Sequence, residues 1–126
     1  MVVRAGRLAA ILVAVICVQA RAEAQPAAVA KSPAIAAFNE CAIHYNKGET
    51  DAALTACERA LAIDPTFADA WFIKGSVMVG NGTIDKAGKA TFPPGTADVL
   101  RRYQALKPDG PHISDVKAML DYVLQK

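Results

Sequence analysis

Apolar residues recur at intervals of three and four along the chain after residue 33, and glycine or proline interrupts them at regular points. This spacing is typical of amphipathic helices, because it places apolar side chains on one helix face. Glycine accepts the positive φ found at helix ends, and proline disfavours a helical conformation at the residue before it. The interruptions are Lys47-Gly48-Glu49, Asp64-Pro65, Gly80-Asn81-Gly82 and Lys107-Pro108. The pattern therefore predicts an all-α fold of antiparallel helix hairpins.

Five helices are expected in this part of the chain, and a segment between the third and fourth cannot be helical. Residues 83–95 end in Phe92-Pro93-Pro94-Gly95, which cannot continue a helix. We expect this segment to be a surface loop, with a lid over a groove or a docking edge as alternatives. Thr50 or Asp51 is expected to cap the second helix and Thr96 the fourth. The expected helices cover residues 34–46, 50–63, 67–79, 96–106 and 114–124.

The segment at 1–24 has the pattern of an export signal. Met1 to Arg7 carries two arginines and no acid, and an uninterrupted apolar run follows from Leu8 to Val18. Such a run suits a signal-peptide core and is too short to cross a bilayer, which takes about 20 residues. Ala22-Glu23-Ala24 offers a small-x-small cleavage site, and Ala20-Arg21-Ala22 is an alternative. We therefore expect cleavage to leave a periplasmic or secreted mature protein that keeps no stable membrane span.

Two other interpretations of the N-terminus are weaker. Cys17 could be a lipidated lipoprotein cysteine, but the residue before it is Ile16 where a small residue is needed. The segment could also stay as an uncleaved anchor.

Residues 25–33 are rich in Ala and Pro without an amphipathic period, which indicates a linker ahead of the folded domain at 34–126.

The charge of the chain excludes some partners. Its 14 basic and 12 acidic residues give a net charge of +2. That surplus lies in the segment at 1–24, which holds Arg4, Arg7 and Arg21 against Glu23 alone. The remaining chain is neutral and has no overall electrostatic attraction to nucleic acid or to an acidic membrane surface.

The helical part resembles the tetratricopeptide repeat, a two-helix unit of about 34 residues. Ala37 and Trp71 are separated by one such repeat length, as are Gly48 and Gly82. The resemblance implies a repeat at 34–67, a second repeat at 68–110 with a nine-residue insertion near 83–95, and a capping helix at 113–125. The matching motifs are Ala37-x2-Glu40-Cys41-x2-His44, then Ala53-x3-Cys57 with Ala60 and Pro65, and Trp71-x2-Lys74-Gly75-x2-Met78.

A disulfide between Cys41 and Cys57 follows from this resemblance. Cys41 takes the place of the glycine in the family's first helix, and Cys57 that of the aromatic residue in its second. These positions face one another, and the two cysteines lie about equally far from the turn at Gly48-Glu49. The expected cleavage removes Cys17 and leaves two cysteines, and an even number in an oxidising compartment favours a bridge. Two buried free thiols, packing as small apolar side chains, are the alternative.

The sequence offers little for catalysis or cofactor binding. Gly82 to Lys89 looks like a phosphate loop but has five residues between its glycines and no Ser or Thr after the lysine. His44 and His112 lack neighbours at ligand spacing, and His44 is expected in the core or a groove. We therefore predict no enzyme activity, no metal and no cofactor. A thiol redox factor is a minor alternative.

The resemblance implies a function in protein binding. Tetratricopeptide proteins bind peptide segments or partner proteins in a concave groove lined by the first helix of each repeat. The alternative is a structural or self-associating envelope component that uses its open helix face. The groove positions implied here are Ile35, Phe38, Asn39, Ala42, Tyr45 and Asn46, followed by Asp69, Phe72, Ile73, Ser76 and Val79.

Overall fold

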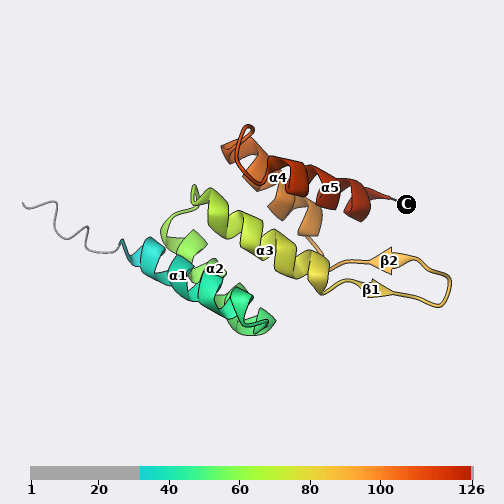
Figure 1. Ribbon diagram of the computed structural model, residues 1–126, viewed down its shortest axis with the longest axis horizontal. Helices are drawn as coiled ribbons and strands as arrows, with labels where there is room; N and C mark the ends of the chain where they lie inside the picture. The colour runs from blue at the N-terminus through green and yellow to red at the C-terminus, as the bar shows by residue number, and fades with distance from the viewer. Residues whose placement is uncertain (1–31, 126) are drawn as a thin grey trace, which may run out of the picture.

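The computed structural model describes residues 32–125. The predicted signal peptide at 1–24 and nearly all of the linker lie outside the described residues. Helices account for most of the described chain, which confirms the all-α fold class (Figure 1). The elements are α1 (Pro33–Asn46), α2 (Thr50–Ile63), α3 (Ala68–Gly80), β1 (Thr83–Ile84), β2 (Ala90–Thr91), α4 (Thr96–Leu106) and α5 (Ile113–Leu124).

The helix α3 lies at the centre of the arrangement. It packs against the α1–α2 hairpin on one side and against α4 and α5 on the other (Figure 1). Each helix also packs against the next one along the chain, so the structure is built hairpin after hairpin. In the part of the chain that the structure describes, no helix combines the length and the apolar character needed to cross a bilayer.

The turn between α1 and α2 is set by Gly48. Its φ is +75°, a conformation that glycine adopts without steric conflict. The amide of Gly48 donates to the carbonyl of Tyr45 at 3.0 Å, and the amide of Glu49 donates to that of His44 at 2.9 Å. These two bonds form a Schellman motif, which satisfies carbonyls left free at the end of α1.

The connection between α2 and α3 is fixed by Asp64. Its Oδ1 accepts hydrogen bonds from the amide of Thr66 at 2.9 Å and from the hydroxyl of Thr66 at 2.6 Å. The indole of Trp71 then donates to the carbonyl of Pro65 at 2.8 Å. An Asp side chain that bonds the backbone two residues later stabilises a turn locally. The Asp-Pro boundary therefore ends α2 and also positions α3.

The segment between α3 and α4 differs from the loop expected at 83–95. Residues 83–91 form a β-hairpin in which Thr83 pairs with Thr91 and Ile84 with Ala90. The amides of Ala87 and Lys89 donate to Oδ1 of Asp85 at 2.8 and 2.9 Å, and Gly88 has a φ of +79°. An Asp that accepts backbone bonds and a glycine at positive φ are the features of a tight hairpin turn.

The helix boundaries agree with the sequence to within about one residue, with small corrections. α1 begins at Pro33, because proline has the φ of a helix and needs no amide partner in the first turn. α4 is preceded by Gly95 at a φ of +83°, and Thr96 is its first residue rather than its cap. Glu49, rather than Thr50 or Asp51, precedes α2. α3 and α5 begin at Ala68 and Ile113.

Candidate functional site

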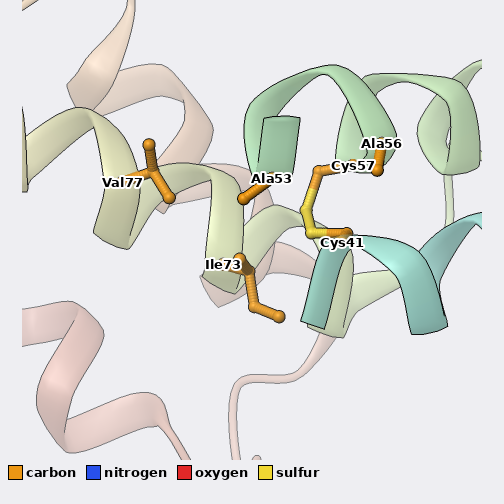
Figure 2. Packing of buried hydrophobic residues seen from close by; sticks show 6 residues of the cluster. All are labelled: Cys41, Ala53, Ala56, Cys57, Ile73 and Val77. Carbon is orange, nitrogen blue, oxygen red and sulfur yellow. A yellow bond between two sulfur atoms is a disulfide. The ribbon is translucent and has the colours of Figure 1, made fainter. Parts of the chain in front are cut away.

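Cys41 of α1 and Cys57 of α2 form a disulfide across the first hairpin, with their Cα atoms 5.1 Å apart. Both residues are fully buried, in a cluster with Ala53, Ile73 and Val77 (Figure 2). The prediction that these two side chains meet is confirmed. Because a sulfur in a disulfide is not a thiolate, neither cysteine offers a nucleophile or a metal ligand in this state.

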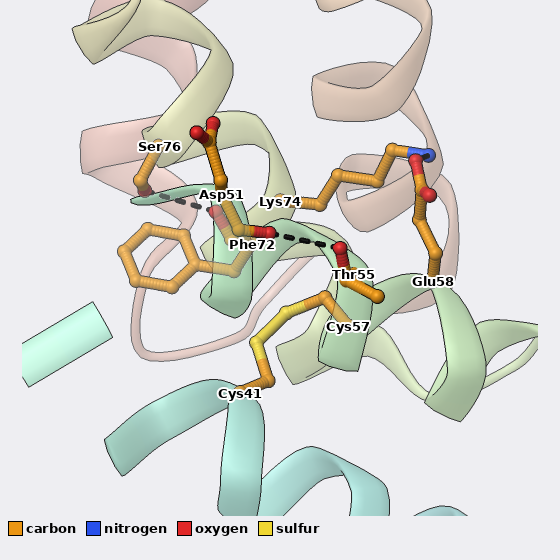
Figure 3. Close-up of a disulfide and its surroundings, with 8 residues drawn as sticks. All are labelled: Cys41, Asp51, Thr55, Cys57, Glu58, Phe72, Lys74 and Ser76. Carbon is orange, nitrogen blue, oxygen red and sulfur yellow. Dashed lines mark hydrogen bonds and ion pairs between the residues drawn. A yellow bond between two sulfur atoms is a disulfide. The ribbon is translucent and has the colours of Figure 1, made fainter. Parts of the chain in front are cut away.

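Polar contacts near the disulfide connect α2 to α3 (Figure 3). The ammonium of Lys74 on α3 lies 3.1 Å from Oε1 of Glu58 on α2. The same ammonium lies 5.9 Å from the centroid of the Trp71 ring. On α2 itself, the hydroxyl of Thr55 donates to the carbonyl of Asp51 at 2.9 Å. Lys74 therefore links the two hairpins close to the bridge that closes the first of them.

The second hairpin has a close contact at the equivalent place. Gly75 lies 34 residues after Cys41, and Leu100 lies 43 residues after Cys57. A Cβ atom on Gly75 would lie 2.6 Å from Cδ2 of Leu100, which is fully buried. The first hairpin is thus closed by a disulfide between α1 and α2, and in the second Leu100 of α4 packs directly over Gly75 of α3.

The α1 residues predicted to form a binding surface lie on one side of the helix, as their spacing requires. Asn39, Tyr45 and Asn46 are exposed, whereas Ile35 and Ala42 are partly buried. Phe38 is also partly buried, and the centroid of its ring lies 4.7 Å from that of Phe67. The exposed amides and the Tyr45 ring are therefore the groups on this side of α1 that a partner can reach directly.

The α3 residues of the predicted surface are more deeply placed than those of α1. Ile73 is only 8% exposed and belongs to the core cluster around Cys41, so it does not lie on an open surface. Asp69 is held by the ammonium of Lys107 at 3.3 Å. The hydroxyl of Ser76 donates to the carbonyl of Phe72 at 2.9 Å, and Val79 is partly buried. This part of the surface consists mainly of packed side chains.

Three of the predicted residues come together around one cluster. Phe38 and Ala42 of α1 and Phe72 of α3 are all partly buried against the buried group that contains the disulfide. Both helices therefore contribute side chains that cover this cluster, and we call this set of residues the α1–α3 face. It comprises Ile35, Phe38, Asn39, Ala42, Tyr45 and Asn46 of α1 with Phe72 and Ser76 of α3.

His112 covers part of this face, which the sequence did not indicate. Its ring stacks on that of Phe72 with centroids 4.0 Å apart and planes at 8°. The backbone amide of His112 donates to the hydroxyl of Tyr103 at 3.2 Å, which fixes the turn before α5. The stretch at 109–112 has the composition of a turn, and nothing in that pattern indicates a contact with a ring on α3.

His44 lies at the turn rather than in the core or a groove. Its Nδ1 is 2.5 Å from Oε2 of Glu49, and the histidine side chain is 33% exposed. The hydrogen bond from His44 lowers the pKa of Glu49, and the charge of nearby Lys47 acts in the same direction.

Hydrogen bonds from the hydroxyl and then the amide of Thr66 lower the pKa of Asp64. The carboxylates of Glu49 and Asp64 lie in the connections between helices, where their hydrogen bonds stabilise the turns.

No group of three or more His, Cys, Asp or Glu side chains is arranged for a metal ion within residues 32–125. Comparison of the chain with known protein families, characterised proteins and solved structures finds no match.

Proposed function

We propose that this chain is an exported tetratricopeptide-type module that binds a peptide or partner protein on the α1–α3 face. It acts by binding and not by catalysis. The observation that carries the proposal is the convergence of Phe38, Ala42 and Phe72 on one cluster, bordered by exposed Asn39, Asn46 and Tyr45. Aromatic rings next to amides suit peptide recognition, since rings supply contact area and amides reach backbone groups.

The repeat assignment is supported by equivalent burial in the two hairpins. Three positions of α2 have counterparts in α4 at one constant spacing, which is the repeat length plus the insertion. Both members of each pair are almost fully buried. The pairs are Ala53 with Thr96, Cys57 with Leu100, and Ala60 with Tyr103.

A binding function also agrees with the chemistry of the described residues. The sulfurs that could have served a redox reaction are buried in a disulfide. The carboxylates with shifted pKa values bond turn residues on the connectors. The N-terminal pattern at 1–24 supports export, and an oxidising compartment is where such a disulfide persists.

The proposal is tested by capture from the envelope and secreted fractions of the source organism. The test variant is Asn39→Ala/Tyr45→Ala, which removes two exposed side chains and leaves the packed Phe38 and Phe72 in place. The matched control is Thr55→Ala/Ile63→Ala on the exposed side of α2, where Ile63 is 53% exposed. We expect the test variant to lose the bound partner and the control to keep it. Equal retention by both variants would overturn the proposal.

A further inference from the structure

The outer edge of β2 has a backbone donor and acceptor that face away from β1. The amide of Asp85 donates to the carbonyl of Lys89 at 3.0 Å, so these two residues form a hydrogen-bonded pair of the ladder. Such pairs alternate with pairs that are not hydrogen-bonded in an antiparallel ladder. The next pair is Ile84 with Ala90. The N–H and C=O of Ala90 therefore point outward, away from the partner strand.

This edge lies beside unfilled space next to α5. Two cavities of about 410 and 380 Å³ both have Lys89 and Ala90 in their walls. The first extends to Tyr122 and Gln125 at the end of α5, and the second to Val123. Figure 1 shows β2 on the side of the hairpin nearer to α5. The space between the strand and the helix thus runs along the free edge.

The contact between Phe92 and Tyr122 holds the hairpin near α5. Their ring centroids lie 5.2 Å apart in an edge-to-face arrangement. A Cβ atom on Gly82 would lie 2.7 Å from the Phe92 ring, so Phe92 is also packed closely on the start of the hairpin. The contacts of Phe92 with Tyr122 and Gly82 therefore hold the hairpin in place beside α5.

The turn of the hairpin carries a small net positive charge, from Lys86 and Lys89 against Asp85. Lys86 and Lys89 are exposed, and neither takes part in an ion pair among residues 32–125. Oδ1 of Asp85 is already engaged by two backbone amides of the turn. Within the described chain, the walls of the two cavities include no Asp or Glu. An acidic occupant would therefore meet lysine without meeting a like charge in the walls.

We propose that an extended acidic peptide segment of another protein binds here as a third strand, between β2 and the end of α5. Its backbone pairs with the N–H and C=O of Ala90, because strand addition uses the free groups of a sheet edge. Alternate side chains of a strand point to opposite faces. Apolar side chains at one set of positions contact Tyr122 and Val123, and acidic side chains at the other set approach Lys89, which lines both cavities. This site is separate from the α1–α3 face.

The experiment measures fluorescence anisotropy of a fluorescein-labelled peptide, Glu-Val-Glu-Val-Glu-Val, titrated with the mature chain. The test variant is Ala90→Pro, which removes the outward amide without removing a ladder bond. Ile84→Pro is the matched control, since the amide of Ile84 points outward from the opposite edge of the same hairpin. We expect Ala90→Pro to weaken binding about tenfold and Ile84→Pro to change it less than about twofold. Circular dichroism checks that both variants keep their helices.

A second arm tests the charge and the nature of the occupant. Lys89→Glu and replacement of the probe by Lys-Val-Lys-Val-Lys-Val are each expected to abolish binding, and added salt to weaken it. Equal effects of the two proline variants, or binding of the two probes with the same affinity, would overturn the proposal. Self-association of the chain that Ala90→Pro removes, seen by light scattering without probe binding, would identify a second copy as the occupant and would also overturn it.

Discussion

The side chain of Leu100 lies directly over Gly75, so that a Cβ atom there would come within 2.6 Å of Cδ2 of the leucine. Leu100 is fully buried and its surroundings restrict any movement away. We predict that Gly75→Ala lowers the free energy of unfolding by about 1–2 kcal/mol, because overlap in a packed core costs roughly 1–3 kcal/mol. That cost exceeds the gain of up to about 1 kcal/mol from alanine in a helix.

Gly80 gives the control for this prediction, since it is also in α3 and has nothing within 4 Å of a Cβ atom. Gly80→Ala should leave stability unchanged or raise it slightly. Urea denaturation of the two variants measures both effects. Gly75→Ala with the stability of the unmodified chain would show that α3 and α4 do not approach as closely as described.

The disulfide should contribute substantially to stability. It closes a sequence separation of 16 residues, for which the loop-entropy estimate is about 3 kcal/mol. We predict that the double variant Cys41→Ala/Cys57→Ala has a free energy of unfolding lower by about 3 kcal/mol. Thermal denaturation with and without a reductant checks it, because the reductant should destabilise the unmodified chain and leave the double variant unaffected. Reaction of a denatured, unreduced chain that begins after Cys17 with a thiol reagent would argue against the bridge.

The Asp64 turn should make stability depend on pH in the acid range. The pKa of Asp64 is lowered in the folded chain, chiefly by the hydroxyl of Thr66. A group with a lowered folded pKa stabilises the fold above its unfolded value, about 3.9 for Asp, and loses this contribution as pH falls through the folded value. We predict that Thr66→Ala raises the Asp64 pKa toward its ordinary value. A carbon-detected NMR titration measures the change, and an unaltered pKa would contradict the assignment.

The stacking of His112 on Phe72 predicts a defined effect of substitution. His112→Ala should destabilise the chain by about 1 kcal/mol, because an aromatic pair contributes roughly 0.5–1.5 kcal/mol beyond its buried area. His112→Phe keeps a ring over Phe72 and should restore most of that loss. Chemical denaturation compares the two variants. Equal stability of both would show that the ring contact contributes nothing.

The helices and the cysteine pair could be predicted because they depend on local signals. Gly48 and the Asp64-Pro65 pair mark helix ends through their own backbone preferences. The facing of Cys41 and Cys57 follows from helix period and turn position once a hairpin is assumed. These properties involve residues that are near in the sequence.

The composition of the candidate face could be predicted only in part. Ile73 has the spacing of a surface position, but it is packed in the buried cluster with Cys41 and Ala53. The contact of His112 with Phe72 depends on how α5 returns across α3, which no local pattern encodes. The hairpin at 83–91 has no signal in the sequence, because its strands have two residues each, too few to show a strand period.

The central claim, that the α1–α3 face binds a partner, is tested most directly by site-specific photo-crosslinking in living cells. Benzoylphenylalanine replaces Tyr45, which is 39% exposed on that face, and separately replaces Ile63 on α2. We predict a discrete protein adduct from position 45 and none from position 63. Adducts of equal yield from both positions, or no adduct from position 45, would contradict the claim.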